Sequence, residues 1–252
     1  MLQAGAADIL RKPFLKTIVL RRIENTLYIL KLKCQKRLEQ NGKNQLIDVF
    51  GSIIQSRKIG SRQHLLRVRL YTEILLKNAR DELSGQYVLD DSTISKIGIA
   101  AALHDIGKIA IPDDILLKPG PLTRDEFKII KTHTIKGCEI LSVLKVIADD
   151  KDFGYFYDIC RYHHESYDGS GYPDGLVGDE IPAIAQIAAI SDVYDTLITK
   201  RPYKDAICHE KAVEMIKSGQ CGTFSPILLS CFLKVCDQFH QIALEYSGGT
   251  EF

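Results

Sequence analysis

Histidines and aspartates recur roughly thirty residues apart along much of this sequence, and they are its best candidates for chemistry. In chain order they are His64, the pair His104-Asp105, His133, the pair His163-His164, and Asp192. Imidazole nitrogens and carboxylate oxygens together suit Fe, Mn, Ni or Zn. A helical bundle can bring such residues together in its core, where a shared carboxylate can bridge two metals about 3.5–4 Å apart. We therefore expect a metal centre.

The pair His104-Asp105 stands at the end of an apolar segment, AALHDIGKIAIPDDIL. Burying two ionisable groups there costs free energy unless something compensates for their lost hydration, and a divalent cation bound by both would do so. By itself, the dipeptide fits a solvent-facing helix end without a ligand at least as well. The other members of the series favour the metal.

The pair His163-His164 leads into a turn-rich segment, HHESYDGSGYPDG. Adjacent histidines can be surface residues, a pH switch or metal ligands, and the pair alone does not distinguish these. The long loop predicted over residues 165–181 favours a functional role, because such loops inside compact domains are usually functional. With His133 before it and Asp192 after it, the pair is predicted to supply two adjacent ligands at a helix end.

Helices must position these residues, because apolar residues recur at helical spacing and strand-like alternation is scarce. Thr123 and Glu126 form a capping-box pattern, and Pro182 suits the first turn of a helix. The expected helices cover residues 61–78, 92–105, 123 to beyond 133, 152–164, 182–199, 210–217 and 226–241. The predicted fold class is all-α, a helical bundle with one long glycine-rich loop.

A further amphipathic segment, residues 14–41, precedes this bundle. Its apolar residues recur at spacings of three and four, namely Leu20, Ile23, Leu27, Leu30 and Cys34. The segment is predicted to be a long linker helix that either packs on its own domain or forms a homodimer with a second copy. Two or three heptads are too few to decide between these.

Composition narrows the class of protein further. A formal net charge of +1 with 45% hydrophobic residues is typical of a globular domain and disfavours binding of duplex nucleic acid through a broad basic surface. No run reaches the ~18 apolar residues of a membrane span, and no signal peptide opens the chain, so no membrane location is expected. The seven cysteines include no CxxC pair and indicate reduced thiols in a cytoplasmic protein.

Three ordered stretches carry a resemblance to a known family. They are HDIGKIAIPDDILLKPGPLT, KTHTIKG, and HHESYDGSGYPDGLVGDEIPAIAQIAAISDVYDTLITKRPYK. In sequence, spacing and order they resemble the HD-GYP family, which are bacterial metal-dependent phosphodiesterases of the HD superfamily that hydrolyse cyclic di-GMP. The resemblance spans roughly residues 52–239 and implies the HD-superfamily helical bundle.

The resemblance also implies a role for each matching residue. One divalent metal would be held by His64, His104, Asp105 and Asp192. A second would be held by His133, His163 and His164, with Asp105 bridging the two metals. The expected cofactors are therefore two divalent transition metal ions. Among the other matching residues, Lys108 would lie beside the attacking hydroxide or scissile phosphate, and Arg201 and Lys204 would contact the substrate phosphates. Asp195 would support the site, and the pocket rim would be formed by Gly171, Tyr172 and Pro173.

Hydrolysis of a phosphodiester is the chemistry expected from two such metals. Metal binding lowers the pKa of water from 15.7 to ~7, so a bridging hydroxide could attack while the cations stabilise the developing charge. Cyclic di-GMP would open to pGpG, and a second cleavage would give GMP. Some family members hold a third metal with a glutamate four residues before the first histidine ligand. Gly60 occupies that position here, so two metals are expected.

Two other functions stay open. A catalytically weak module could bind a cyclic dinucleotide or a signalling partner of the diguanylate cyclase type. A hydrolase of a hybrid cyclic dinucleotide would act on the same phosphate ring, whereas the Gly-Tyr-Pro loop and the KRPYK run disfavour a nucleoside triphosphate.

Residues 4–14, AGAADILRKPF, resemble the last strand and following loop of a response-regulator receiver domain, with Lys12-Pro13 at its lysine and cis-proline. The alternative is an unrelated leader helix. Since a receiver's phosphorylatable aspartate lies on an earlier strand, this chain alone is not expected to respond to phosphorylation.

The expected division is a receiver remnant and linker helix (1–41), a phosphodiesterase domain (42–245) and a disordered tail (246–252). His209 and His240 fit no ligand spacing and are expected to cap a helix or lie at the surface.

Overall fold

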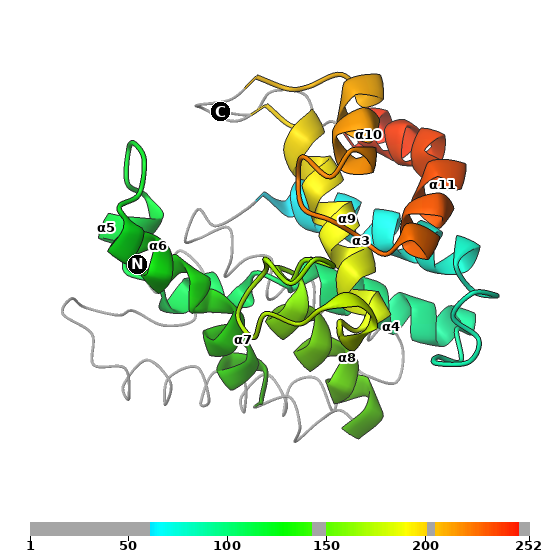
Figure 1. Ribbon diagram of the computed structural model, residues 1–252, viewed down its shortest axis with the longest axis horizontal. Coiled ribbons are helices and arrows are strands. Elements are labelled where there is room, and N and C mark those ends of the chain that lie inside the picture. Colours follow the sequence, from blue (N-terminus) through cyan, green and yellow to red (C-terminus); the bar gives the residue numbers. More distant parts are fainter. Residues whose placement is uncertain (1–60, 143–149, 201–204, 247–252) are drawn as a thin grey trace, which may run out of the picture.

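The computed structural model describes residues 61–142, 150–200 and 205–246, and every regular element in these ranges is a helix. The helices are α3 (Arg62–Asn78), α4 (Asp91–Ala102), η2 (Ile106–Ala110), α5 (Asp113–Leu116), α6 (Arg124–Lys131), α7 (His133–Leu141), α8 (Asp150–Tyr162), η4 (Gly178–Glu180), α9 (Ala183–Ile198), α10 (His209–Lys217) and α11 (Pro226–Glu245). The predicted all-α fold is confirmed for these ranges (Figure 1). The expected linker helix and Gly60 lie outside them.

Helix α3 packs against α4, α9 and α11. Its apolar residues share one face at helical spacing, and Leu65, Val68 and Leu75 are at most 2% exposed. Tyr71 on the same face stacks on Phe239 of α11, with ring centroids 4.5 Å apart. These contacts join helices from opposite ends of the described chain into one hydrophobic core.

Every residue of helix α9 (Ala183–Ile198) from Ala183 to Ser191 is buried. It contacts α3, α8, α10 and α11, and in Figure 1 it runs between the pair α7 and α8 and the pair α10 and α11. A helix with such surroundings has little room for charge, yet it carries Asp192 and Asp195 in its last turns. Charged groups in such a helix require partners.

Of the helix boundaries that differ from the prediction, three fall at candidate ligands. The helix predicted over residues 92–105 ends at Ala102, so His104 and Asp105 lie in the turn before η2. The helix predicted to continue past His133 is interrupted at Thr132. At the interruption the backbone of Gly107 in η2 lies very close to that of His133. A Cβ added to Gly107 would lie 1.8 Å from the carbonyl oxygen of His133, so only glycine fits there. Helix α8 ends one residue before His163.

Among the described helices, α11 alone is long and apolar enough to cross a membrane by length and composition. Its mean hydropathy is 1.2 over the most apolar window. Leu228, Phe232, Val235 and Phe239 are nevertheless buried, on the face that packs against α3 and α9. Packing of this face explains much of the apolar character of the helix.

Candidate metal centre

Two groups of potential ligands lie side by side in the core of the bundle. The first cluster is His64, His104 and Asp192, and the second cluster is Asp105, His133, His163 and His164. Within each cluster the ligand atoms lie within 4.8 Å of one another. The structure thus brings together all seven residues that the sequence series singled out as metal ligands.

Helix ends and local hydrogen bonds orient the first cluster. His64 is in the first turn of α3, where the Ser61 side chain accepts a hydrogen bond from its backbone N–H. Its Nδ1 donates to Asp195 at 2.8 Å, which leaves Nε2 3.6 Å from Oδ1 of Asp192. His104 donates from Nδ1 to the Ala101 carbonyl at 2.7 Å and points Nε2 towards the same Asp192 oxygen, 3.8 Å away. Both imidazoles therefore present Nε2 to one carboxylate.

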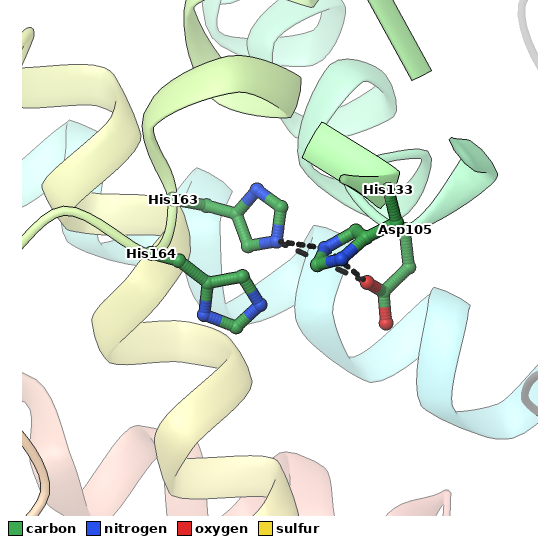
Figure 2. Close-up of side chains that lie close together, drawn as sticks. All are labelled: Asp105, His133, His163 and His164. Carbon is green, nitrogen blue, oxygen red and sulfur yellow. Dashed lines mark hydrogen bonds and ion pairs between the residues drawn. The ribbon is translucent and has the colours of Figure 1, made fainter. Parts of the chain in front are cut away.

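The second cluster is oriented in the same way. His133 donates from Nδ1 to the Ile130 carbonyl at 2.7 Å, and His163 from Nδ1 to the Ile159 carbonyl at 3.0 Å. Their Nε2 atoms are 3.4 Å apart, and that of His133 is 3.3 Å from Oδ1 of Asp105. Figure 2 shows these side chains and His164 pointing toward one another, with the two adjacent histidines on the opposite side from His133 and Asp105.

Asp105 lies between the clusters. Its Oδ1 faces His133 of the second cluster, and its Oδ2 lies 3.4 Å from Nε2 of His104 in the first cluster. Lys108 also contacts Oδ2, through its ammonium group. One carboxylate with an oxygen toward each cluster is the arrangement that a bridging ligand requires.

Two buried polar atoms test whether these residues fit a metal. Among the residues described, Nε2 of His104 and Oδ1 of Asp105 have no hydrogen-bond partner. Buried polar atoms are rarely left unpaired, because losing water without a new partner costs about 1–3 kcal/mol. Oδ1 of Asp105 offers a lone pair, and Nε2 of His104 offers one when a metal displaces its proton. The residues present therefore fit divalent metals that accept nitrogen and oxygen.

Protonation in the second cluster is compatible with metal binding. Burial lowers the pKa of His163 well below its usual value, and burial followed by repulsion from His133 lowers the pKa of His164 to about 3. Burial also lowers the pKa of His133. Neutral imidazoles keep a free lone pair, which is the form that coordinates metal.

His104 and Asp105 show that this part of the core favours positive charge. Burial alone would disfavour the imidazolium form of His104, but the Asp105 and Asp192 carboxylates and the Ala101 carbonyl together outweigh it and raise the pKa of His104 to about 9. Burial alone would likewise raise the pKa of Asp105, but Lys108 and His104 hold it well below its usual value. The carboxylate is therefore ionised and attracts cations into the cluster.

Asp195 supports the first cluster by holding the His64 side chain. The principal partner of Asp195 is Arg67, which was not predicted from the sequence. Arg67 donates to both carboxylate oxygens of Asp195, at 2.6 and 2.9 Å, and also to the carbonyl of Tyr246 at 3.1 Å. Burial would raise the pKa of Asp195, but His64 and Arg67 lower it. An arginine three residues after a candidate ligand, on the apolar face of α3, was the available signal. Tyr246, at the expected start of the tail, is the C-cap of α11.

The loop after His164 is held by Glu165, a second residue that sequence reasoning missed. Its carboxylate accepts hydrogen bonds from the backbone N–H groups of residues 174, 175 and 176. Gly171 is packed so closely that an added Cβ would lie 2.3 Å from the Ser166 nitrogen. Its neighbour Tyr172, before the cis peptide bond to Pro173, stacks on His164 with ring centroids 4.7 Å apart.

Two lysines, Lys108 and Lys131, lie near the side chains of the two clusters and of the loop. Lys108 reaches Asp105, and Lys131 lies over the Tyr172 ring, 4.7 Å from its centroid. Lys131 was not singled out from the sequence. Arg201 and Lys204 lie outside the described residues.

A family model described as HD domain matches residues 49–224. A Vibrio cholerae protein named probable cyclic di-GMP phosphodiesterase is 37% identical over 207 residues, which cover 81% of this chain and 47% of that protein. The cyclic di-GMP phosphodiesterase response regulator RpfG of Xanthomonas campestris is 34% identical over 253 residues, covering 98% of this chain and 66% of that protein. This chain therefore spans about half to two thirds of the length of these curated relatives.

Other similarities bear on substrate and fold. A Vibrio cholerae protein named 3′3′-cGAMP-specific phosphodiesterase 2 is 37% identical over 195 residues, which cover 77% of this chain and 35% of that protein. Among solved structures, Bd1817, an HDG"Y"P protein from Bdellovibrio bacteriovorus, matches with a TM-score of 0.54 at 16% identity, over 85% of this chain and 70% of that one. At this identity the match supports the helical fold alone.

Proposed function

Because the chain belongs to the HD domain family, we propose that it is an HD-GYP phosphodiesterase that hydrolyses cyclic di-GMP with two divalent transition metals. The observation that carries the proposal is the position of Asp105, which directs one carboxylate oxygen toward each of two histidine clusters. The names of relatives at 34–37% identity support the same reaction and substrate.

The proposed ligands divide between the two clusters. His64, His104 and Asp192 would hold one metal, His133, His163 and His164 the other, and Asp105 would contact both. Fe, Mn, Ni and Zn all suit this set of ligands. When bound, such metals supply a water of lowered pKa and neutralise charge on phosphoryl oxygens.

The other residues would bind the substrate and exclude water. Lys108 is a partly exposed cation beside Asp105 and would contact a nonbridging phosphate oxygen. Lys131, which lies against Tyr172 at the rim, would attract the second phosphate of the ring. Arg201 and Lys204 are proposed to contact the substrate phosphates as well. Glu165 holds the loop that carries Tyr172 and so keeps this rim in place.

The finer assignments belong to the same proposal. We propose pGpG as the first product, with GMP arising from a second cleavage, and a cytoplasmic location. Residues 1–41 are proposed to be a receiver-domain remnant and linker helix, through which a homodimer could form. The alignment with a response regulator over 98% of this chain supports the receiver-domain assignment. A cyclase-type signalling partner would couple synthesis of the dinucleotide to its breakdown.

Hydrolysis by purified, metal-loaded protein tests the proposal. Protein loaded anaerobically with Mn²⁺ or Fe²⁺ should convert cyclic di-GMP to pGpG or GMP, separable by chromatography. His104→Ala and Asp105→Ala should abolish turnover, whereas Asp205→Ala, at an exposed position, should leave it unchanged. An intact dinucleotide after prolonged incubation of metal-replete protein would contradict the proposed reaction, and tight binding without turnover would favour a receptor.

A second candidate substrate is a hybrid cyclic dinucleotide. The relative named for 3′3′-cGAMP is as similar to this chain as the one named for cyclic di-GMP, at 37% identity in both cases. The two substrates share the phosphate ring and differ in one base. Comparing kcat/KM for the two dinucleotides in the same preparation decides between them, because kcat/KM measures discrimination directly.

A further inference from the structure

We propose a second metal site, separate from the active-site clusters, formed by His209 of α10 with Cys236 and Asp237 of α11 and suited to Zn²⁺ or a similar divalent ion. One ligand atom from each residue lies within 4.8 Å of the other two. Nothing in the proposed phosphodiesterase reaction uses these residues.

The geometry brings three kinds of ligand together from two helices. Nε2 of His209 is 3.4 Å from Oδ1 of Asp237, and Cys236 is its neighbour in the chain. The ring of His240, four residues after Cys236 and so on the same face of α11, stacks on the ring of His209 with centroids 4.7 Å apart. The stacked ring restricts the orientation of His209 and covers one side of the site.

A buried tyrosine fixes His209 in the orientation that a metal ligand needs. Nδ1 of His209 is 2.8 Å from the hydroxyl of Tyr194, a side chain with no exposed surface. With its Nδ1–H donated to this hydroxyl, the imidazole presents the Nε2 lone pair to Cys236 and Asp237. Histidine ligands in proteins are commonly held in this way by a hydrogen bond from the other ring nitrogen.

The ligand types indicate which ion would bind. A thiolate with an imidazole and a carboxylate is the combination that Zn²⁺ accepts, and a fourth position would remain for water. The two active-site clusters contain only imidazole and carboxylate. Asp237 is 95% exposed, so an ion can reach the site from solvent.

The position of the site suggests what it does. It joins α10 to α11, and Tyr194 connects it to α9 between Asp192 and Asp195. A metal bound here would hold these helices together behind the active site. The expected effect is on thermal stability of the helical packing rather than on the catalytic residues.

Cobalt provides a test that distinguishes this site from the active site. Co²⁺ bound by a cysteine thiolate gives a sulfur-to-cobalt charge-transfer band in the near ultraviolet, which histidine and carboxylate ligands do not give. Full-length protein titrated with Co²⁺ should develop this band. Cys236→Ser should abolish it and lower bound cobalt by one equivalent, while cyclic di-GMP hydrolysis continues.

Matched variants keep the test decisive. Cys208→Ser, a neighbouring exposed cysteine outside the cluster, should retain the band. Asp237→Ala, at an exposed position where folding is not at risk, should weaken cobalt binding at this site at least about tenfold. His133→Ala, in the active site, should lose active-site metal and keep the band. Absence of the band in the wild-type protein, or its persistence in Cys236→Ser, would overturn the proposal. A protein that shows the band without hydrolysing cyclic di-GMP would support this site and contradict only the proposed phosphodiesterase function.

Discussion

Nδ1 of His64 in α3 donates a 2.8 Å hydrogen bond to Asp195 in α9, although the two residues are 131 positions apart in the chain. The bond fixes which nitrogen of His64 faces Asp192 and the centre of the first cluster. Since Asp195 is 1% exposed and also accepts two bonds from Arg67, it is held rigidly itself. Metal affinity at the first cluster should therefore depend on a residue that does not touch the metal.

Asp195→Asn should weaken metal binding at the first cluster by about 10–100-fold, the usual effect of losing such a supporting carboxylate. The amide keeps the size of the side chain but removes the charge that orients His64. Titration with Mn²⁺ followed by equilibrium dialysis measures the affinity. Asp205→Asn, which is 95% exposed, is the control and should bind as the wild type does. Unchanged affinity in Asp195→Asn would show that His64 needs no such support.

Arg67→Met should destabilise the fold by about 3–5 kcal/mol, because it leaves the buried Asp195 carboxylate without its main partner. Arg67 also donates to Thr199 and to the carbonyl of Tyr246, so it ties α3 to the ends of α9 and α11. Urea denaturation monitored by circular dichroism gives the free energy of unfolding. Arg80→Met, at a pair whose side chains are 47% and 90% exposed, should cost less than about 1 kcal/mol. A similar decrease in the free energy of unfolding in both variants would contradict the argument that the buried position of the Arg67–Asp195 pair makes its loss costly.

Hydrophobic periodicity in the sequence predicts much of the helical fold. It does not predict the turns that position His104 and His133 in the site. The sequence predicts α3, α9 and α11 because their apolar residues repeat at helical spacing over long stretches. It places His104 inside a helix, whereas His104 lies in the turn after α4. It also predicts one continuous helix through His133, whereas His133 is the first residue of α7, after an interruption at Thr132. The close contact between Gly107 and His133 is a tertiary contact, so no local pattern reveals it.

The candidate ligands could be chosen from residue type and spacing, but their supports could not. Histidines and aspartates in apolar segments stand out in any sequence. Arg67 and Glu165 look like ordinary charged residues, and their roles appear only when distant backbone and side-chain groups are placed beside them. His209, expected to cap a helix or lie at the surface, is the first residue of α10 and is bonded to the buried Tyr194.

Asp105→Asn and His133→Ala should differ in how much metal they retain. Asp105 has an oxygen toward each cluster, so its loss should lower occupancy of both metals and reduce hydrolysis below detection. His133 contributes to the second cluster only, so its loss should remove one metal and leave the other bound. Metal content by inductively coupled plasma mass spectrometry measures both. Equal metal loss in the two variants would contradict a bridging position for Asp105.

Gly171→Ala should impair hydrolysis through backbone displacement alone. A Cβ at this position would lie 2.3 Å from the Ser166 nitrogen and 2.4 Å from the Glu165 Cα, and neither backbone atom can turn aside as a side chain can. The loop must shift, and with it Tyr172, which stacks on His164. Because misplacement by about 1 Å can cost about 10²-fold in rate, we expect a loss of that order in kcat/KM. Gly154→Ala in α8 has no atom within 4 Å of the added Cβ and should raise the free energy of unfolding by about 0.5–1 kcal/mol without changing kcat/KM. Wild-type kcat/KM in Gly171→Ala would show that the loop does not position the rim of the site.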